Sequence, residues 1–386
     1  MEGVCDPSKA ALTSDIVRAW RYIANGVTPA TTSTREKYWR HWCTYCNEFK
    51  RHPFLRDATP IEQSVIITAF AGRVRTGFYG RGHEISVSSV AEALAAVSKT
   101  IELAGEQSPV YVTPDEYILP VKRCVEGMRR MDAPAVPQLA VPVSVPHECL
   151  SIATSSTKPG TLATADLIVI AFYYLLRVGE YTAPRFVKRN GVLVRATRTK
   201  QFRVKDVGFF ANGKVLHKSS PLRALLQADA ATLKITNQKN GRMGQTIHHE
   251  AFPSKFCPVK ALARRIHHIL ANGGSPDSLI CEYYDGTSVN NIQPTTIVTL
   301  VRQAAKNLSL NEAGIDIDLI GSHSLRAGGA MALKLLNKSD TLIMKMGRWS
   351  GLTFLQYIHN QIAHLSHNLA SEMSTNIPFL NIASIG

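Results

Sequence analysis

Long apolar runs are absent from this sequence of 386 residues. It contains no stretch of about 18 consecutive apolar residues, the length that an α-helix needs to cross a bilayer. Residues 1–10 have neither the basic start nor the apolar centre of a secretory signal peptide. We therefore expect a soluble, intracellular protein with no membrane partner.

Cysteines are few, and their number is odd: Cys5, Cys43, Cys46, Cys124, Cys149, Cys257 and Cys281. They form no disulfide framework, so we expect free thiols in a reducing compartment. Cys43 and Cys46 make a CxxC near His41, which is compatible with a zinc ligand pair or with thiols on an aromatic helix face. Without a second Cys/His pair close by, the spacing favours thiols packed in a core.

Acidic residues are scarce in residues 177–268, which hold 19 Lys and Arg against 4 Asp and Glu. Residues 1–132 hold 17 against 15, so segment 177–268 accounts for the whole formal net charge of +15. A folded domain this basic is expected to bind a polyanion, most simply a nucleic-acid backbone. The alternative is a generally basic surface that only aids solubility.

The length indicates two domains, and a hydrophobic content of 45% indicates packed cores. Residues 1–29 form an N-terminal extension with one helix candidate at 14–24. Apolar residues at helical spacing then predict further helices at 34–51, 60–76, 88–104 and 114–131. No strand pattern interrupts them, so we expect residues 30–132 to form a small helical domain.

Residues 133–146 contain four prolines in fourteen positions. Proline lacks a backbone N–H and fixes φ, which excludes a helix interior and a central strand. This segment therefore predicts an extended, semi-rigid linker and the domain boundary.

Residues 147–386 mix helical and strand patterns. Helices are expected at 162–181, 257–271 and 295–308. Two Asn-Gly turns predict β-hairpins: strands 207–210 and 214–217 around Asn212-Gly213, and strands 232–238 and 245–249 around Asn240-Gly241. The connection at 272–291 gives little signal. The predicted fold class is mainly α with a small antiparallel β-sheet.

The strongest chemical signal lies in residues 321–357. His323 and Arg326 are three residues apart at the start of an apolar helical pattern, so both side chains leave one face of a helix. A second amphipathic run ends in Gly347-Arg348-Trp349, and Tyr357 follows. A guanidinium binds two phosphate oxygens and stays charged, an imidazole moves a proton, and a phenol can attack phosphorus. The set therefore suits a reaction at a phosphodiester.

Arg177 ends the apolar segment 162–181 in the sequence LLRVGE. A charged residue at the end of a buried helix is unfavourable unless it has an anionic partner. That partner is either Glu180, in a structural ion pair, or a bound phosphate.

The HxxR, GRW and Tyr spacing, together with LLRVGE, resembles the tyrosine recombinases, the phage-integrase and Cre-like family. The wording HSLRAGGA, GRWS and YI is most similar to the eukaryotic recombinases of Crypton-type mobile elements. The resemblance covers about residues 30–370 and is strongest at 171–181, 232–249 and 319–365. It implies a SAM-like helical core-binding domain, a recombinase catalytic domain, and a nuclear location in a eukaryotic host.

The resemblance also implies a site-specific recombinase or integrase that mobilises a DNA element without metal, cofactor or ATP. By carry-over onto matching positions, the catalytic residues are Arg177, Lys239, His323, Arg326, Trp349 and Tyr357. The two arginines clamp the scissile phosphate while Tyr357 forms a 3′-phosphotyrosyl link. Lys239 lies at the tip of the second hairpin and protonates the leaving 5′ oxygen; Lys234, Arg242 and Lys255 are competitors for that role.

Double-stranded DNA is the implied partner. The candidate DNA contacts are Arg348, Lys255, Arg264, Arg265 and Arg242. Residues 360–373 repeat apolar residues at helical spacing, and recombinases of this type hand such a C-terminal helix to the next protomer. We therefore expect a homo-oligomer, a tetramer on paired sites, although the helix can also pack on its own domain.

One position departs from the family pattern. Most members place His or Trp directly after the glycine, whereas here Arg348 takes that place and Trp349 follows. Trp349 is then the supporting residue, or it only packs in the core. Two other classes of function also remain open: a domesticated DNA-binding protein without catalysis, and a type IB topoisomerase, which uses a similar residue set.

Overall fold

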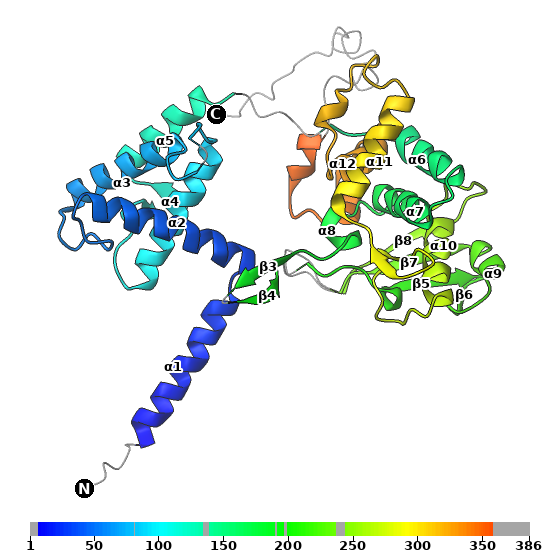
Figure 1. Cartoon of the computed structure of the whole chain (residues 1–386), viewed down its shortest axis with the longest axis horizontal. Helices are drawn as coiled ribbons and strands as arrows, with labels where there is room; N and C mark the ends of the chain where they lie inside the picture. The colour runs from blue at the N-terminus through cyan, green and yellow to red at the C-terminus, as the bar shows by residue number, and fades with distance from the viewer. Residues whose placement is uncertain are drawn as a thin grey trace, which may run out of the picture. The chain divides into compact units, whose positions relative to one another are not determined.

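The computed structural model describes residues 7–80, 82–133, 139–189, 191–196, 199–236 and 244–357. The chain divides into two compact units, Met1–Ala135 with Phe186–Thr197 and Val136–Arg185 with Arg198–Gly386, which we call the first and second unit. Both are mainly helical with small antiparallel sheets (Figure 1), so the predicted fold class is confirmed.

The first unit is built mainly from helices α1 (Pro7–Asn25), α2 (Pro29–Glu48), α3 (Pro60–Arg75), α4 (Val87–Leu103) and α5 (Leu119–Met131). Thr28 and Thr59 cap α2 and α3 with their side-chain oxygens, and a proline follows each of them. The aromatic face of α2 is the centre of the core. Trp42 is fully buried there, and its indole N–H donates to the Pro53 carbonyl at 2.8 Å.

The CxxC of this unit consists of free thiols, with Cys46 buried in the core and Cys43 partly buried. The ring of His41 stacks on Tyr79 with a centroid distance of 4.7 Å. Among the described residues, no group of three His, Cys, Asp or Glu side chains is placed to hold a metal ion. The geometry thus agrees with packed thiols.

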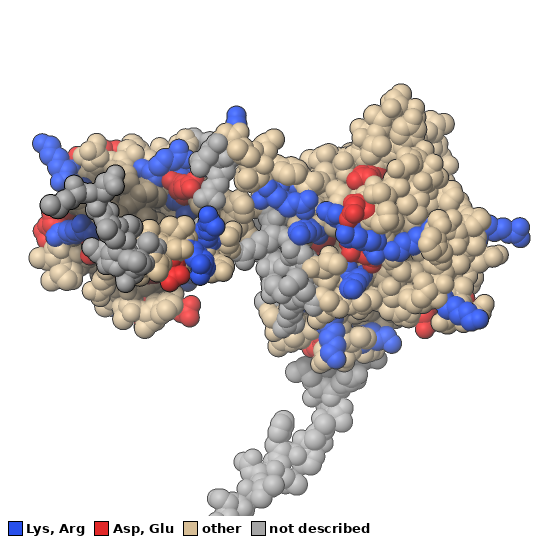
Figure 2. Space-filling model, turned by 90° about the horizontal axis from the view of Figure 1, so that it is seen from below, with Lys and Arg blue, Asp and Glu red and all other residues tan. Residues whose placement is uncertain are grey.

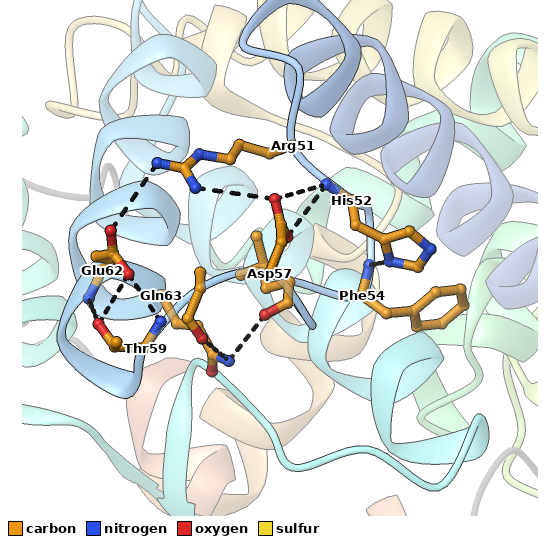
Figure 3. Close-up of polar contacts among 9 residues, drawn as sticks. Arg51, His52, Phe54, Asp57, Thr59, Glu62 and Gln63 are labelled. Atoms are coloured by element: carbon orange, nitrogen blue, oxygen red, sulfur yellow. Dashed lines mark hydrogen bonds and ion pairs between the residues drawn. The ribbon is translucent and has the colours of Figure 1, made fainter.

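A polar network fixes the loop between α2 and α3 (Figure 3). The Asp57 carboxylate accepts the backbone N–H of His52 at 3.3 Å and lies 3.8 Å from the Arg51 guanidinium. Gln63 donates from its side chain to the carbonyls of Leu55 and Ala58. The loop is therefore held by backbone-directed hydrogen bonds at both ends.

The helix predicted at 114–131 begins later than expected. Pro114 and Asp115 form the turn between β1 (Tyr111–Thr113) and β2 (Glu116–Tyr117), and α5 starts only at Leu119. Pro-Asp suits a tight turn as well as a first helical turn, and the rings of Tyr111 and Tyr117 stack at 5.0 Å across the two strands. The expectation of a unit without strands was therefore wrong.

A hairpin that follows Arg185 also belongs to the first unit. It consists of β3 (Phe186–Arg189) and β4 (Val192–Arg195), and it was not predicted. The backbone N–H of Ala30 at the start of α2 donates to the Ala196 carbonyl at 3.2 Å. The chain thus contributes to the first unit from two distant parts of the sequence.

The predicted extended linker ends earlier than expected. Residues 134–138 lie outside the described residues, and α6 (Ser144–Thr154) already begins inside the proline-rich stretch. Pro146 fits there because it lies in the first turn, where a helix needs no backbone N–H. Val141 is buried and donates its N–H to the Ser324 carbonyl at 3.3 Å, so this end is part of the second unit.

Helix α7 (Pro159–Tyr173) is the centre of the second unit. Its ten residues Ala163–Phe172 are all buried, as expected for a helix that is apolar on every side. Four helices pack against it (Figure 1): α6, α10 (Pro258–Ala271), α11 (Pro294–Asn307) and α12 (Ser324–Leu335). Gly328 and Gly329 let α12 approach closely, since a Cβ at either position would collide with Val141 or Phe172.

Helix α7 is shorter than the predicted helix 162–181. Leu175 adopts a left-handed backbone conformation with φ of 50°, which ends the helix, and the short helix α8 (Val178–Tyr181) follows. Buried Leu175 and Leu176 extend the apolar pattern beyond the true end of the helix. Periodicity therefore could not locate the break.

The main sheet of the second unit has the order β6-β5-β7-β8 and is antiparallel throughout. Its strands are β5 (Val207–Ala211), β6 (Lys214–Leu216), β7 (Ala230–Lys234) and β8 (Thr246–Glu250). Asn212 and Gly213 make the predicted turn, both with positive φ. The tip of the second predicted hairpin, residues 237–243, lies outside the described residues.

Two small elements of the second unit were not predicted. Helix α9 (Leu222–Leu226) precedes β7, and the pair β9 (Glu282–Tyr284) and β10 (Val289–Asn291) occupies the weakly patterned connection. Short 3-10 turns, Val204–Asp206 and Ile317–Leu319, complete the connections. Such short elements carry too few residues for a periodic signal.

The described chain ends with α13 (Asp340–Gly347) and a 3-10 helix, Leu352–Tyr357. The predicted terminal helix at 360–373 lies outside the described residues. None of the helices in the described ranges is long and apolar enough to cross a membrane.

Candidate active site

The carbonyl oxygen of Leu175 is the meeting point of the site. Because Leu175 ends α7 with a positive φ, its carbonyl is turned toward side chains from other segments. It accepts hydrogen bonds from Nη1 of Arg326 at 2.7 Å and from Nη2 of Arg348 at 3.0 Å. Arg177 follows two residues later. Three arginines from distant parts of the sequence thus come together.

Arg177 lies at the N-terminus of α8. Its backbone N–H donates to Oε2 of Glu180 at 2.8 Å, and its Nη1 lies 3.4 Å from Oε1. The ion pair considered from the sequence is therefore present. The Arg177 side chain is still 21% exposed, whereas that of Glu180 is 3% exposed. The guanidinium can thus reach a ligand at the surface while the carboxylate holds its backbone.

Arg326 lies in the first turn of α12 and is only 2% exposed. Besides Leu175, its guanidinium donates to the Gly347 carbonyl. The ring of Trp349 lies against it, with 4.3 Å between the guanidinium carbon and the ring centroid. These contacts fix the direction of the side chain.

Trp349 is 9% exposed and belongs to a small core with Leu175, Ala330, Ile343 and Phe354. Its ring crosses over Gly347 so closely that a Cβ at that position would overlap it. Trp349 thus packs in a core and also contacts the guanidinium of Arg326, while its role as the supporting catalytic residue stays a prediction.

Arg348 occupies the C-terminal cap of α13 in the left-handed conformation, with φ of 60°. It is 1% exposed, and its Nη2 lies 2.9 Å from Oε2 of Glu180. Burial lowers the pKa of Arg348, and the nearby Glu180 carboxylate opposes this shift. Within the described part of the chain, its Nε and Nη1 are buried with no hydrogen-bond acceptor.

The remaining catalytic candidates are only partly described. His323 is the residue before α12, is partly buried, and has Nδ1 3.4 Å from the Ser322 hydroxyl. Tyr357 is the last residue of the 3-10 helix, but its side chain lies outside the description. Lys239 and its neighbour Arg242 fall in residues 237–243, also outside it. Lys234, one competitor, is exposed at the end of β7.

Two of the predicted DNA contacts are engaged inside the protein. Arg264 binds the buried carboxylate of Asp166 through Nε at 2.9 Å. Arg265 is 2% exposed and donates to the backbone carbonyls of Ile280 and Glu282. Burial lowers the pKa of Arg265 to about 10, which still leaves it charged at neutral pH. Both guanidinium groups are thus held by partners within the second unit, and DNA contact by Arg264 and Arg265 stays a prediction.

Lys255 differs from these two residues because it is exposed, with its Nζ 5.2 Å from the centroid of the Phe256 ring. Other exposed basic residues of the segment include Lys188, Lys200, Lys205, Lys214 and Arg223. Figure 2 shows Lys and Arg gathered, with Asp and Glu among them, on one face of the second unit. The exposed basic residues of segment 177–268 thus lie on strands and loops more than on α10.

Sequence reasoning missed two parts of the site. The Leu175 carbonyl gave no signal, since any residue supplies one. Glu180 was noticed only as a partner of Arg177, and its contact with Arg348 spans 168 residues of sequence. That contact could not be read from spacing.

No family model matches the chain, and no curated protein is a significant match. Similar solved structures include the Tn1549 transposon integrase in complex with circular intermediate DNA, with 11% identity over 80% of this chain and 84% of that chain and a TM-score of 0.42. XerH site-specific recombinase bound to palindromic difH substrate shows 14% identity over 80% and 71%, with a TM-score of 0.46. XerA recombinase shows 13% identity over 92% and 97%, with a TM-score of 0.36. Similarity this distant concerns the fold and carries no inference about chemistry.

Proposed function

We propose that this chain is a tyrosine recombinase that breaks and rejoins DNA strands through a 3′-phosphotyrosyl intermediate. The observation that supports this most is the convergence of Arg177, Arg326 and Arg348 on one carbonyl and one carboxylate. Guanidinium groups fixed in advance can stabilise the charge that develops on a phosphate in the transition state. The motif resemblance supplies the remaining roles.

In the proposed reaction the phenol oxygen of Tyr357 attacks the scissile phosphorus. A P–O bond to tyrosine forms as the bond to the 5′ oxygen breaks, and Lys239 gives that oxygen its proton. Arg177 and Arg326 bind the non-bridging oxygens, and His323 assists in moving the tyrosine proton. The energy of the broken phosphodiester bond is retained in the phosphotyrosyl ester. Rejoining therefore needs neither ATP nor metal.

The position of the 3-10 helix supports Tyr357 as the nucleophile. Phe354, three residues earlier, is fully buried, and its ring centroid lies 5.7 Å from that of Trp349. Trp349 in turn lies against the guanidinium of Arg326. The backbone that carries Tyr357 is thereby anchored to the same small core as the arginines.

Incubation with a pool of nicked DNA duplexes of randomised sequence tests the proposal, because a nick near the cleavage point traps the covalent link. A denaturing gel should show an adduct with the wild-type protein and none with Tyr357→Phe. Tyr284→Phe, which removes a hydroxyl bonded to the Gly286 carbonyl, is the matched control and should keep the adduct. DNA binding without an adduct would instead indicate a domesticated binding protein. An adduct with relaxation of supercoils but no strand exchange would indicate a topoisomerase.

We further propose that the protein mobilises a Crypton-like element as a tetramer on paired sites, with the helix predicted at 360–373 given to the neighbouring protomer. The assignment of the first unit as a core-binding domain and of the second unit as a catalytic domain belongs to the same proposal. Deletion of residues 361–386 should leave binding to one site intact and abolish assembly on two sites. Unchanged complexes in sedimentation would mean that the tail packs in cis.

A further inference from the structure

Arg348 stands where the resemblance predicts His or Trp, and its backbone conformation is unusual. A φ of 60° is uncommon for a residue with a side chain and costs about 1 kcal/mol relative to glycine. The side chain is also buried as a charged group, which is unfavourable without compensating contacts. Glycine at this position would avoid both costs. The contacts of the guanidinium therefore have to explain why an arginine is found here.

The contacts of Arg348 centre on one atom. Its Nη2 group carries two hydrogens and has two acceptors, the Leu175 carbonyl at 3.0 Å and Oε2 of Glu180 at 2.9 Å. Each acceptor also serves another arginine. Leu175 accepts from Arg326, and the same Oε2 of Glu180 accepts the backbone N–H of Arg177.

We propose that Arg348 is a positioning residue that fixes Arg177 and Arg326 relative to each other by bridging the two acceptors that hold them. This deepens the proposed function and rests on it. Arg348 sets the Glu180 carboxylate, which holds the start of α8 and so the backbone of Arg177. It also holds the Leu175 carbonyl at the point where Arg326 is bonded.

Trp349 has a different task, because its ring lies against the guanidinium of Arg326. The ring of Trp349 packs against that guanidinium, whereas Arg348 connects the Leu175 carbonyl, which holds Arg326, to the Glu180 carboxylate, which holds Arg177. Nε and Nη1 of Arg348 are buried and have no hydrogen-bond acceptor among the described residues, so its observed hydrogen bonds all come from Nη2. Arg348, which follows Gly347, therefore has a positioning role of its own and does not replace the His or Trp of the family pattern.

Arg348→Gly tests this directly, because glycine suits the left-handed backbone and leaves a guanidinium-sized space. The measurement is single-turnover cleavage of a nicked duplex, with DNA affinity measured alongside. We expect affinity close to wild type and a cleavage rate lower by about 10²-fold, the loss typical of a small misplacement. Free guanidinium at concentrations that do not unfold the protein should restore much of the rate, while urea, similar in shape but uncharged, should not.

Arg302→Ala is the matched control. Its guanidinium also donates to two backbone carbonyls, those of Ile320 and Asp318, but lies on α11. Cleavage by this variant should be close to wild type and indifferent to guanidinium. Wild-type cleavage by Arg348→Gly, or a slow rate that guanidinium leaves unchanged in a folded variant, would overturn the proposal.

If Arg348→Gly does not fold, Glu180→Gln decides, since it keeps the shape and removes the charge that Arg348 binds. We expect slower cleavage with unchanged DNA affinity, and a wild-type rate would again overturn the proposal. Failure of the proposed function is distinguishable, because then the wild-type protein itself forms no adduct.

Discussion

Buried and partly buried arginines occur in two regions of the second unit, and their partners differ. On α10, Arg264 faces the carboxylate of Asp166, and Arg265 donates to two carbonyls. Around Leu175, one carbonyl and one carboxylate are shared among Arg177, Arg326 and Arg348. Arg348 still has two buried donors without an acceptor in the described part of the chain. We therefore expect Arg264 and Arg265 to act mainly on stability, whereas the proposed function assigns phosphate binding to the group around Leu175.

The largest expected effect concerns stability in the α10 region. Asp166→Asn should lower the free energy of unfolding by about 3–5 kcal/mol, because it leaves Arg264 without its buried partner. Cleavage per folded molecule should not change. Urea denaturation of the full chain measures the first quantity. Asp277→Asn, which breaks an exposed pair with Arg203 and Lys205, is the control and should change stability little. Equal losses of unfolding free energy in both variants would contradict the expected difference between the two ion pairs.

The next effect concerns catalysis in the Leu175 region. Arg326→Lys keeps the charge but cannot bond two acceptors and lie flat on Trp349. Single-turnover cleavage should fall about 10²–10³-fold, as for loss of one transition-state donor. Arg265→Lys is the matched buried arginine, and its cleavage rate per folded molecule should stay near wild type. A rate loss of similar size in both would mean that burial alone matters.

A smaller effect is expected from the exposed basic residues. If Lys255 contacts a DNA phosphate, Lys255→Gln should reduce the slope of log affinity against log salt by about 0.9. Lys205→Gln removes a lysine that already lies 2.6 Å from Asp277 and should change the slope less. DNA binding measured over a range of salt concentrations compares the two. Identical slopes in all three proteins would remove Lys255 from the DNA surface.

The smallest expected effect is a pH dependence of stability that arises where β8 contacts the end of α7. Burial lowers the pKa of His249, whose Nε2 lies 2.9 Å from the Tyr173 carbonyl. The neutral ring therefore contributes stability that is complete above the unfolded pKa of about 6.5 and declines as pH falls toward the lower folded value. His249→Gln should flatten this decline. His248→Gln, on an exposed neighbour, should alter it much less, because the charge of His248 contributes less than burial to the lowered pKa of His249.

Local rules predicted much of the fold. The helix predicted at 60–76 matches α3, and Asn212-Gly213 marked a hairpin, because short-range spacing and turns depend on neighbouring residues. The end of α7 was not predictable, since Leu175 takes a backbone conformation that leucine rarely adopts. The sequence also did not predict which arginines of the basic segment point into the core. Arg264 finds Asp166 across 98 residues and Arg348 finds Glu180 across 168, and no local pattern records such pairs.

The proposed function depends most on where the DNA becomes attached. Residues 349–386 contain no Lys or Arg, and Tyr357 is their only tyrosine. Trypsin therefore releases the whole tail as one peptide, and mass spectrometry of the digested adduct can assign the linkage without ambiguity. We predict a nucleotide joined to Tyr357 in this peptide. A nucleotide on any other peptide, or an unmodified tail in a protein that has cleaved its DNA, would contradict the proposed function.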